Sequence, residues 1–155
     1  MDFRCILNKS GILLLGALLC LACNNGKNSV EKVPFKYIEP PVMMSQGEIP
    51  GYIARNFWRN YTPNVDSVSL DEASANFFGF ILSADKKYTK KAVDNAFQKA
   101  DSIAVAGEKR LLLKLISDAE KTFYNPNSPY LDEEVYLLFL ENVLKSEALS
   151  ETDKL

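Results

Sequence analysis

Residues 108–123 have the sequence EKRLLLKLISDAEKTF, and this stretch decides the fold class. Its apolar side chains recur at intervals of three and four residues, which is the spacing of one buried face of an α-helix. They are Leu111, Leu112, Leu115, Ile116, Ala119 and Phe123. Gly107 is a natural break before the stretch, and the negative charge of Glu108 suits a first helical turn. We therefore predict an amphipathic helix over residues 108–123.

Four more segments on either side show the same helical periodicity. Ser69 and Glu72 have the spacing of a capping box that would start the second helix, and Thr89 is expected to cap the third. The predicted buried faces are Ile49, Ile53, Phe57 and Tyr61; Ala73, Phe77 and Ile81; Val93, Ala96, Phe97, Ala100, Ile103 and Ala104; and Val135, Leu138, Phe139, Val143 and Leu144. No window shows sustained period-two alternation bounded by turns, so strands have little support. The predicted class is all-α, a single bundle of about five helices.

A proline-rich segment over residues 33–50 precedes the helices. Its prolines are Pro34, Pro40, Pro41 and Pro50. Because proline fixes its own φ angle and keeps the preceding residue out of the α region, this segment should be extended. Phe35, Tyr37 and Ile38 lie among the prolines, and we expect them to hold the segment across the helical body as a strap.

The first 22 residues have the order of a secretory signal. Arg4 and Lys9 give a basic start, residues 12–22 are an unbroken apolar run, and the small Ala22 stands directly before Cys23. The apolar run is shorter than the ~20 residues that a membrane-spanning helix needs. A cysteine in this place suggests a bacterial lipoprotein signal, in which Cys23 is acylated and becomes the mature N-terminus. An ordinary secretory signal with an incidental cysteine is the alternative.

These features divide the chain into a lipoprotein signal peptide over residues 1–22, a flexible polar tether over 23–34 and a helical domain over 35–155. We expect the protein in the cell envelope of a Gram-negative bacterium, anchored by its N-terminal lipid to the periplasmic face of the outer membrane. Ser150 and Asp153 have capping-box spacing close to the last residue. Either the tail frays there, or the chain is a shortened version of something longer.

Composition excludes several classes of function. Lys and Arg number 18 against 20 Asp and Glu, for a net charge of -2. With no basic stripe, nucleic acid is not an expected partner. Histidine is absent, and all three cysteines, Cys5, Cys20 and Cys23, lie in or at the end of the signal. The mature chain therefore holds no Ser-His-Asp or Cys-His machinery, no disulfide and no thiolate metal site. We expect no enzymatic activity, no cofactor and no metal.

Three stretches together resemble a known family. They are YIEPPVMM at 37–44, residues 52–61 with FWRN at 57–60, and YNPNSP at 124–129 followed by EEVY at 133–136. The chain resembles the helical domain of unknown function that precedes a thioredoxin-like domain in lipoproteins of anaerobic Gram-negative bacteria. The resemblance covers about residues 35–149, and the proline-asparagine-serine-proline turn is its most specific element.

In that family the polypeptide continues through another helix into a thioredoxin-like domain that bears the redox cysteines. No position here matches those cysteines, so the redox chemistry is not carried over. The resemblance implies a scaffold that spaces or orients a redox partner at the membrane, and that partner would be a thioredoxin-like or other periplasmic protein. It also favours a truncated or stand-alone copy, because Leu155 falls where the family's next helix would start.

Three aromatic residues are candidates for a binding surface. Trp58 and Tyr61 could form a platform for a sugar or peptide, and Phe78 could dock a partner domain; packing in the core is the simpler interpretation of each. Ser67 is a candidate for O-glycosylation. The sequence DSV at 66–68 matches a short acidic-hydroxyl-apolar pattern that some of these bacteria glycosylate, and we expect it in a loop.

The sequence therefore favours a non-catalytic, membrane-anchored helical module that acts as a scaffold or interaction domain. Two alternatives stay open. One is a periplasmic protein that binds a peptide or glycan in a helical groove edged by Trp58 and Tyr61. The other is the remnant of a thiol-disulfide oxidoreductase that lacks its catalytic domain.

Overall fold

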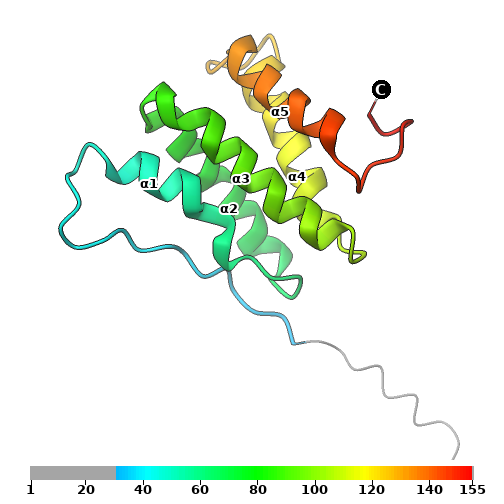
Figure 1. Cartoon of the computed structure of the whole chain (residues 1–155), viewed down its shortest axis with the longest axis horizontal. Helices are drawn as coiled ribbons and strands as arrows, with labels where there is room; N and C mark the ends of the chain where they lie inside the picture. The colour runs from blue at the N-terminus through cyan, green and yellow to red at the C-terminus, as the bar shows by residue number, and fades with distance from the viewer. Residues whose placement is uncertain (1–30, 155) are drawn as a thin grey trace, which may run out of the picture. The chain divides into compact units, whose positions relative to one another are not determined.

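The computed structural model describes residues 31–154, and within them five α-helices form one bundle (Figure 1). The helices are α1 (Ile49–Asn56), α2 (Ser67–Ser83), α3 (Lys86–Ala104), α4 (Arg110–Ala119) and α5 (Glu133–Lys145). A 3-10 turn, η1 (Phe57–Asn60), continues α1, and a π-helical segment, η2 (Glu120–Tyr124), continues α4. The described residues contain no strand, only an isolated bridge between Val33 and Val65. The predicted all-α class is confirmed.

Helix α3 is the centre of the bundle. It packs against α1, α4 and α5, while α2 packs against α1 and α4. Figure 1 shows the consequence for the two outer helices: α1 and α5 lie on opposite sides of α3. The molecule therefore has two well-separated flanks, one formed by α1 and the other by α5.

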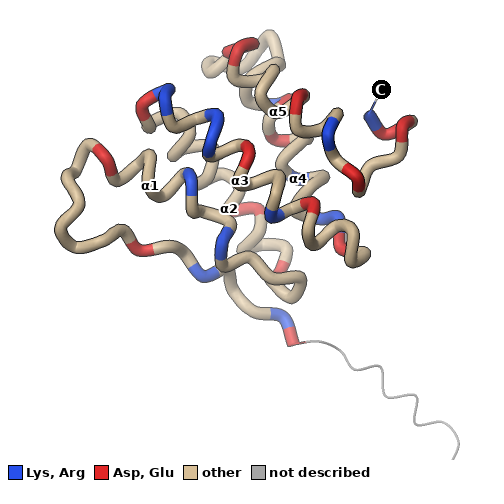
Figure 2. Tube along the Cα trace, in the orientation of Figure 1, with Lys and Arg blue, Asp and Glu red and all other residues tan. Residues whose placement is uncertain are grey.

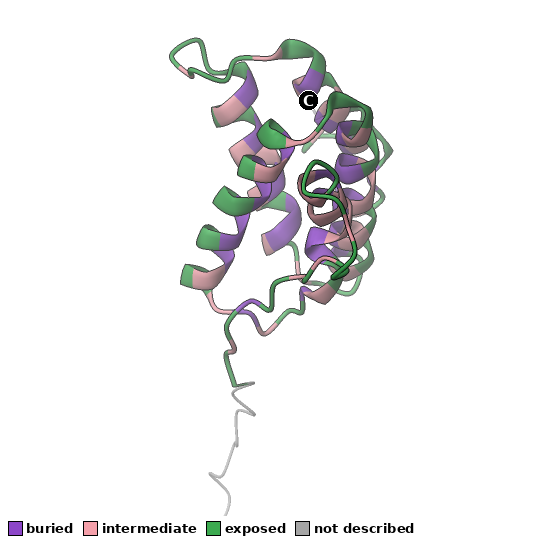
Figure 3. Ribbon diagram, turned by 90° about the vertical axis from the view of Figure 1, so that its left-hand side faces the viewer, coloured by how far each residue is buried: buried purple, intermediate pink, exposed green. Residues whose placement is uncertain are grey.

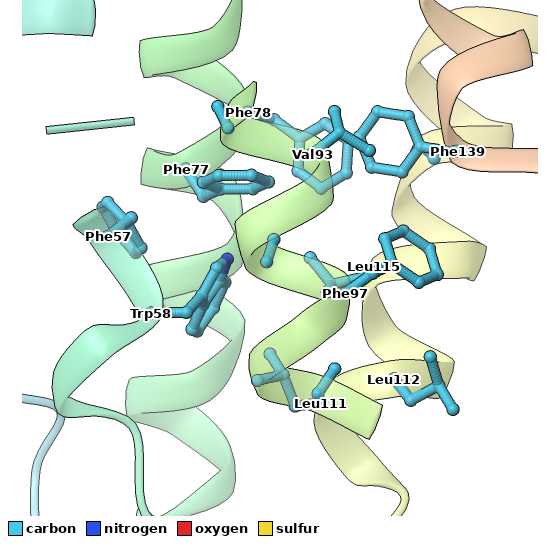
Figure 4. Packing of buried hydrophobic residues seen from close by; sticks show 14 of the residues in the cluster. Phe57, Trp58, Phe77, Phe78, Val93, Phe97, Leu111, Leu112, Leu115 and Phe139 are labelled. Carbon is cyan, nitrogen blue, oxygen red and sulfur yellow. The ribbon is translucent and has the colours of Figure 1, made fainter. Parts of the chain in front are cut away.

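The core is rich in aromatic side chains, and buried positions occupy the inward-facing side of each helix (Figure 3). Phe57 and Phe77 lie 5.6 Å apart between ring centroids, and Phe78 stacks on Phe139 at 5.6 Å (Figure 4). The rings therefore continue from η1 through α2 to α5. Complete burial of one such side chain contributes roughly 1.5–3 kcal/mol, so this series of rings is a main source of stability.

The first half of the proline-rich segment lies against the helical bundle. Phe35 is buried and stacks on Phe57 with 5.4 Å between ring centroids. Tyr37 meets the edge of Phe35 at 5.1 Å. Beyond the prolines, Val42 and Met43 are exposed. The predicted strap is therefore present, and its contact with the helices is made by the residues on the N-terminal side of Pro40.

Aspartates cap three of the helices. The side chains of Asp66, Asp85 and Asp132 accept hydrogen bonds from the backbone N–H groups of Ser69 (2.9 Å), Lys87 (3.0 Å) and Val135 (3.1 Å). In each case this bond is the main reason that the pKa of the aspartate is lowered. The predicted caps at Ser69 and Thr89 are wrong. An aspartate three or four residues earlier satisfies the free amides, so α2 and α3 begin sooner.

The stretch that decided the fold class forms α4 and η2. Gly107 has φ +103°, which only glycine adopts readily, so the chain turns there as predicted. Glu108 lies before the helix, and its carboxylate accepts a hydrogen bond from the N–H of Arg110 at 2.7 Å. The buried stripe continues through the wider turn of η2 to Phe123.

The predicted capping box near the last residue is confirmed. Ser150 donates to Asp153 Oδ2 from its backbone N at 3.1 Å and from its Oγ at 2.7 Å. In return, the backbone N–H of Asp153 donates to Ser150 Oγ at 3.3 Å. The side-chain bond from Ser150 is the main reason that the pKa of Asp153 is lowered.

Candidate functional site

The three aromatic residues predicted as a binding surface lie in the core. Trp58, Tyr61 and Phe78 are 2%, 0% and 5% exposed. The strap closes the outer side of η1, because Phe35 packs on Trp58 with 5.4 Å between ring centroids. Phe78 of α2 packs against the rings of Phe123 and Phe139. The interpretation of these residues as an exposed platform is wrong, and the simpler one, packing in the core, is confirmed.

Two polar atoms of this aromatic cluster are buried without a partner. Neither Trp58 Nε1 nor the Tyr61 hydroxyl has a hydrogen bond within the part of the chain that the structure describes. Burial raises the pKa of Tyr61, and the nearby Arg110 acts in the opposite direction. A buried hydroxyl without a partner costs free energy, so packing of the rings outweighs this loss.

The other two predicted sites have different outcomes. Ser67 is exposed, as the modification hypothesis requires, but it is the first residue of α2 rather than part of a loop. Asp66 beside it uses its carboxylate to cap the helix. Cys23 and the predicted signal lie outside the described residues. The structure therefore corrects the setting of Ser67 and leaves the lipidation of Cys23 a prediction.

No three Asp, Glu, His or Cys side chains gather at a metal-binding distance within residues 31–154. Figure 2 shows basic and acidic residues interspersed along the helices. None of the helices between residues 31 and 154 has the length and hydropathy of a membrane span.

The most distinctive surface lies on α5. Tyr124 of η2 joins Tyr136, Leu137, Leu140 and Leu144 of α5, and we call these five residues the α5 outer face. Tyr124 and Tyr136 stack with 4.8 Å between ring centroids and 16° between ring planes. Tyr124 and Leu137 are 54% and 56% exposed. With Glu133, the first four residues line a surface hollow of about 480 Å³.

This face exists because α5 is apolar on two sides. Val135, Phe139 and Val143 point into the core, while Leu137, Leu140 and Leu144 follow a second helical stripe. Leu144 was predicted to be buried, and that prediction is wrong. Contiguous exposed apolar surface is typical of interaction sites, whereas a single exposed leucine is ordinary. This face was not among the predicted surfaces, although the second apolar stripe of α5 is visible in the sequence.

A family model described as a domain of unknown function (DUF5106) matches residues 22–155. The chain belongs to this family. The predicted resemblance, to a helical domain of unknown function associated with thioredoxin-like proteins, is thereby confirmed.

One solved structure is similar to this DUF5106 chain: a thioredoxin-like protein from Bacteroides caccae ATCC 43185, determined by crystallography. The TM-score is 0.62 and the sequence identity 22%, over 77% of this chain and 44% of that one. At this identity the similarity concerns the fold alone. The DUF5106 chain thus spans less than half of the protein that it resembles. No curated protein matches it.

Proposed function

We propose that this DUF5106 chain is a non-catalytic helical module that is anchored by lipid on Cys23 and holds a thioredoxin-like protein against the α5 outer face. The anchor would place it on the periplasmic face of the outer membrane. The single observation that carries the proposal is the α5 outer face, where the exposed Tyr124 stacks on the partly buried Tyr136 beside a stripe of leucines.

The composition of this face supports binding to a protein. Interface centres are enriched in aromatic side chains and depleted in charge, with polar residues at the rim. Here Tyr124, Tyr136 and Leu137 form the centre. The exposed carboxylates of Glu133 and Glu141 lie on the same helix and supply a polar margin. An aromatic pair that is already stacked loses little side-chain freedom on binding, which favours affinity.

The choice of partner rests on the similarity to the Bacteroides caccae protein. This chain matches 44% of a protein described as thioredoxin-like. The part of such a protein that this chain does not match is therefore the class of partner that we propose for the α5 outer face. The flank formed by α5 is available for it, because α3 and α4 cover only the inner side of that helix.

The absence of catalysis is proposed from the residue types. The sequence has no histidine, and its cysteines stand at positions 5, 20 and 23 only. A module without imidazole or free thiol would contribute position and orientation, while the partner would supply the redox chemistry.

Docking is tested by calorimetric titration of the full chain, purified in a mild non-ionic detergent. The titrant is a polypeptide comprising the part of the Bacteroides caccae protein outside the matched 44%. We expect saturable binding that Leu137→Glu weakens at least about tenfold, because it places a charge in the centre of the interface. Leu113→Glu is the matched control: Leu113 on α4 is equally exposed, at 54%, and lies outside the face. Equal effects of the two variants, or no binding, would contradict the proposal.

Anchoring is tested separately by expression with an alkyne-tagged fatty acid in a Gram-negative host. We expect the wild-type chain to carry the label and to fractionate with outer membranes. Cys23→Ser should lose both the label and the membrane fraction. An unlabelled wild-type chain would remove the anchor from the proposal without touching the docking result.

A further inference from the structure

A second surface lies on the opposite flank, where the C-terminal part of α1 and η1 meet α3. It is a groove of about 210 Å³. Its lining includes three buried residues, Ala54 of α1, Ala96 of α3 and Trp58 of η1. The volume is below the 300–1,000 Å³ typical of pockets for small-molecule ligands. It suits a single side chain and its adjoining backbone.

The lining is cationic. Arg55, Arg59 and Lys99 line the groove, and no Asp or Glu does. None of these three cations forms an ion pair among residues 31–154. The neighbouring Asp94 of α3 is held instead by Lys90 and by Asn142 of α5. A concentration of positive charge in a chain of net charge -2 indicates a local preference for anions.

One of the lining cations, Arg55, is held by two residues that lie just outside the lining. Arg55 Nε donates to the carbonyl oxygen of Gly51 at 2.9 Å, and the guanidinium lies over the ring of Tyr88 at 4.4 Å from its centroid. The hydrogen bonds of the described residues use Nε alone, so both terminal nitrogens can receive a ligand. A fixed guanidinium fork matches the geometry of a carboxylate.

Amide side chains complete the lining. Asn95 donates from Nδ2 to the carbonyl oxygen of Arg55 at 2.8 Å, which leaves its Oδ1 as an acceptor. Both groups of Asn56 are already used, because its Nδ2 donates to the carbonyl oxygen of Tyr52 at 2.9 Å and its Oδ1 accepts from Nη2 of Arg59 at 3.1 Å. Gln98 is exposed at the margin of the groove. Donors and acceptors side by side match the N–H and C=O groups of a peptide backbone.

From this arrangement we propose that the groove, which we call the Arg55 groove, binds a carboxylate side chain of an acidic peptide segment. The carboxylate would receive the terminal nitrogens of Arg55 together with the charges of Arg59 and Lys99, and the amides of Asn95 and Gln98 would bind the adjoining backbone. The flank is distinct from the α5 outer face, so the inference goes beyond the proposed function and stands or falls separately.

Two other anions are less well matched. Phosphate is typically held by the N–H groups at a helix N-terminus, whereas the groove meets α1 at its C-terminal end and α3 in its middle. A uronic acid would call for an open aromatic face against the sugar ring. Trp58, the only ring in the lining, is 2% exposed.

The test is titration of the full chain in mild non-ionic detergent at about 50 mM salt, where surface electrostatics are only partly screened. The probes are end-capped pentaglutamate and pentaglutamine peptides, inorganic phosphate and an oligogalacturonate. We expect pentaglutamate to bind with the greatest affinity and pentaglutamine not to bind. Arg55→Gln should weaken pentaglutamate binding about tenfold, since it removes a charge-assisted pair of hydrogen bonds.

Single substitutions distinguish a specific binding site from general electrostatic attraction of the peptide to the surface. Arg59→Gln and Lys99→Gln, at more peripheral positions, should each weaken binding about threefold, and they keep the test valid if Arg55→Gln unfolds the helix. Arg55→Lys retains the charge without the fork and should also weaken binding. Lys109→Gln is the matched control, because Lys109 is exposed, forms no ion pair in the described chain and lies outside the groove. Absence of binding, an equal effect of Lys109→Gln, or stronger binding of phosphate or the oligogalacturonate would each overturn the proposal.

Discussion

Two aromatic clusters of this chain have similar distances between their rings and opposite surroundings. Phe57 and Trp58 lie 5.1 Å apart between ring centroids beneath the strap, and Tyr124 and Tyr136 lie 4.8 Å apart on α5. The first pair is almost completely buried, whereas Tyr124 is about half exposed. The difference comes from Phe35, which covers the first cluster, while nothing in the described chain covers the second. Aromatic density by itself therefore does not distinguish core from interface.

The largest effect is expected from the buried cluster. Phe57→Ala removes a ring that contacts Phe35 and Phe77, and such truncations in a core cost about 3–5 kcal/mol. Tyr124→Ala, at the exposed cluster, should cost less than about 1 kcal/mol. Urea unfolding followed by circular dichroism measures both. Similar losses for the two variants would show that the clusters are not different in kind.

The second effect tests how tightly the α1–α3 contact is packed. A Cβ at Gly51 would lie 2.7 Å from Cε2 of Tyr88, closer than real contacts allow. Gly51→Ala should therefore destabilise the fold by about 1–3 kcal/mol, as overpacking does. In Tyr88→Ala the space is open, so adding Gly51→Ala there should cost little. An additive double-mutant cycle would contradict this, because residues in contact are expected to couple.

The helix α4 and the helix caps show how far the sequence could predict the fold. The stripe of residues 108–123 and the break at Gly107 were sufficient for α4 and the turn before it, because their pattern is local. The caps at Ser69 and Thr89 were mispredicted for a local reason too: Asp66 and Asp85 offered competing acceptors earlier in the chain. A carboxylate that accepts hydrogen bonds from the helix amides makes the helix begin before the position that the serine or threonine indicates.

The sequence pattern shows two apolar stripes on α5, but it does not show which of them another element covers. Leu144 and Val143 are adjacent in a helix that is apolar on both sides, and only the position of α3 and α4 decides which of them is covered. The same holds for Trp58, which the strap encloses from a distant part of the chain. The Arg55 groove required α1 and α3 to be placed together. Pairing between elements, rather than their local periodicity, separates surface from core.

A third and smaller effect concerns the hydroxyl of Tyr61. Because this group is buried without a hydrogen bond, Tyr61→Phe should leave stability at pH 7 unchanged or raise it by up to about 1 kcal/mol.

The pH dependence gives a sharper readout of the same substitution. Burial raises the pKa of Tyr61 above its unfolded value of about 10, so the folded state holds the proton more strongly. Its contribution to stability is complete below pH ~10 and is lost as the pH rises through the folded pKa. Tyr61→Phe should therefore lose less stability than wild type in alkaline unfolding curves. Tyr136, whose pKa burial also raises, contributes equally to both proteins. Identical alkaline curves would show that the Tyr61 hydroxyl is not sealed from water.

The smallest effect belongs to the α5 outer face and is informative because it is small. Leu137 is more than half exposed, so Leu137→Ser should change the free energy of unfolding by no more than about 0.5 kcal/mol. Val143, on the buried side of the same helix, is the matched control: Val143→Ala should cost roughly 2 kcal/mol through lost burial and a residual cavity. Thermal unfolding in the same detergent measures both. If Leu137→Ser were as costly as Val143→Ala, the leucine stripe would be part of the core, and the apolar surface on α5 would need no partner to explain it. A near-zero change would mean that the stripe is retained at no benefit to the isolated fold, which is what a surface maintained for binding requires.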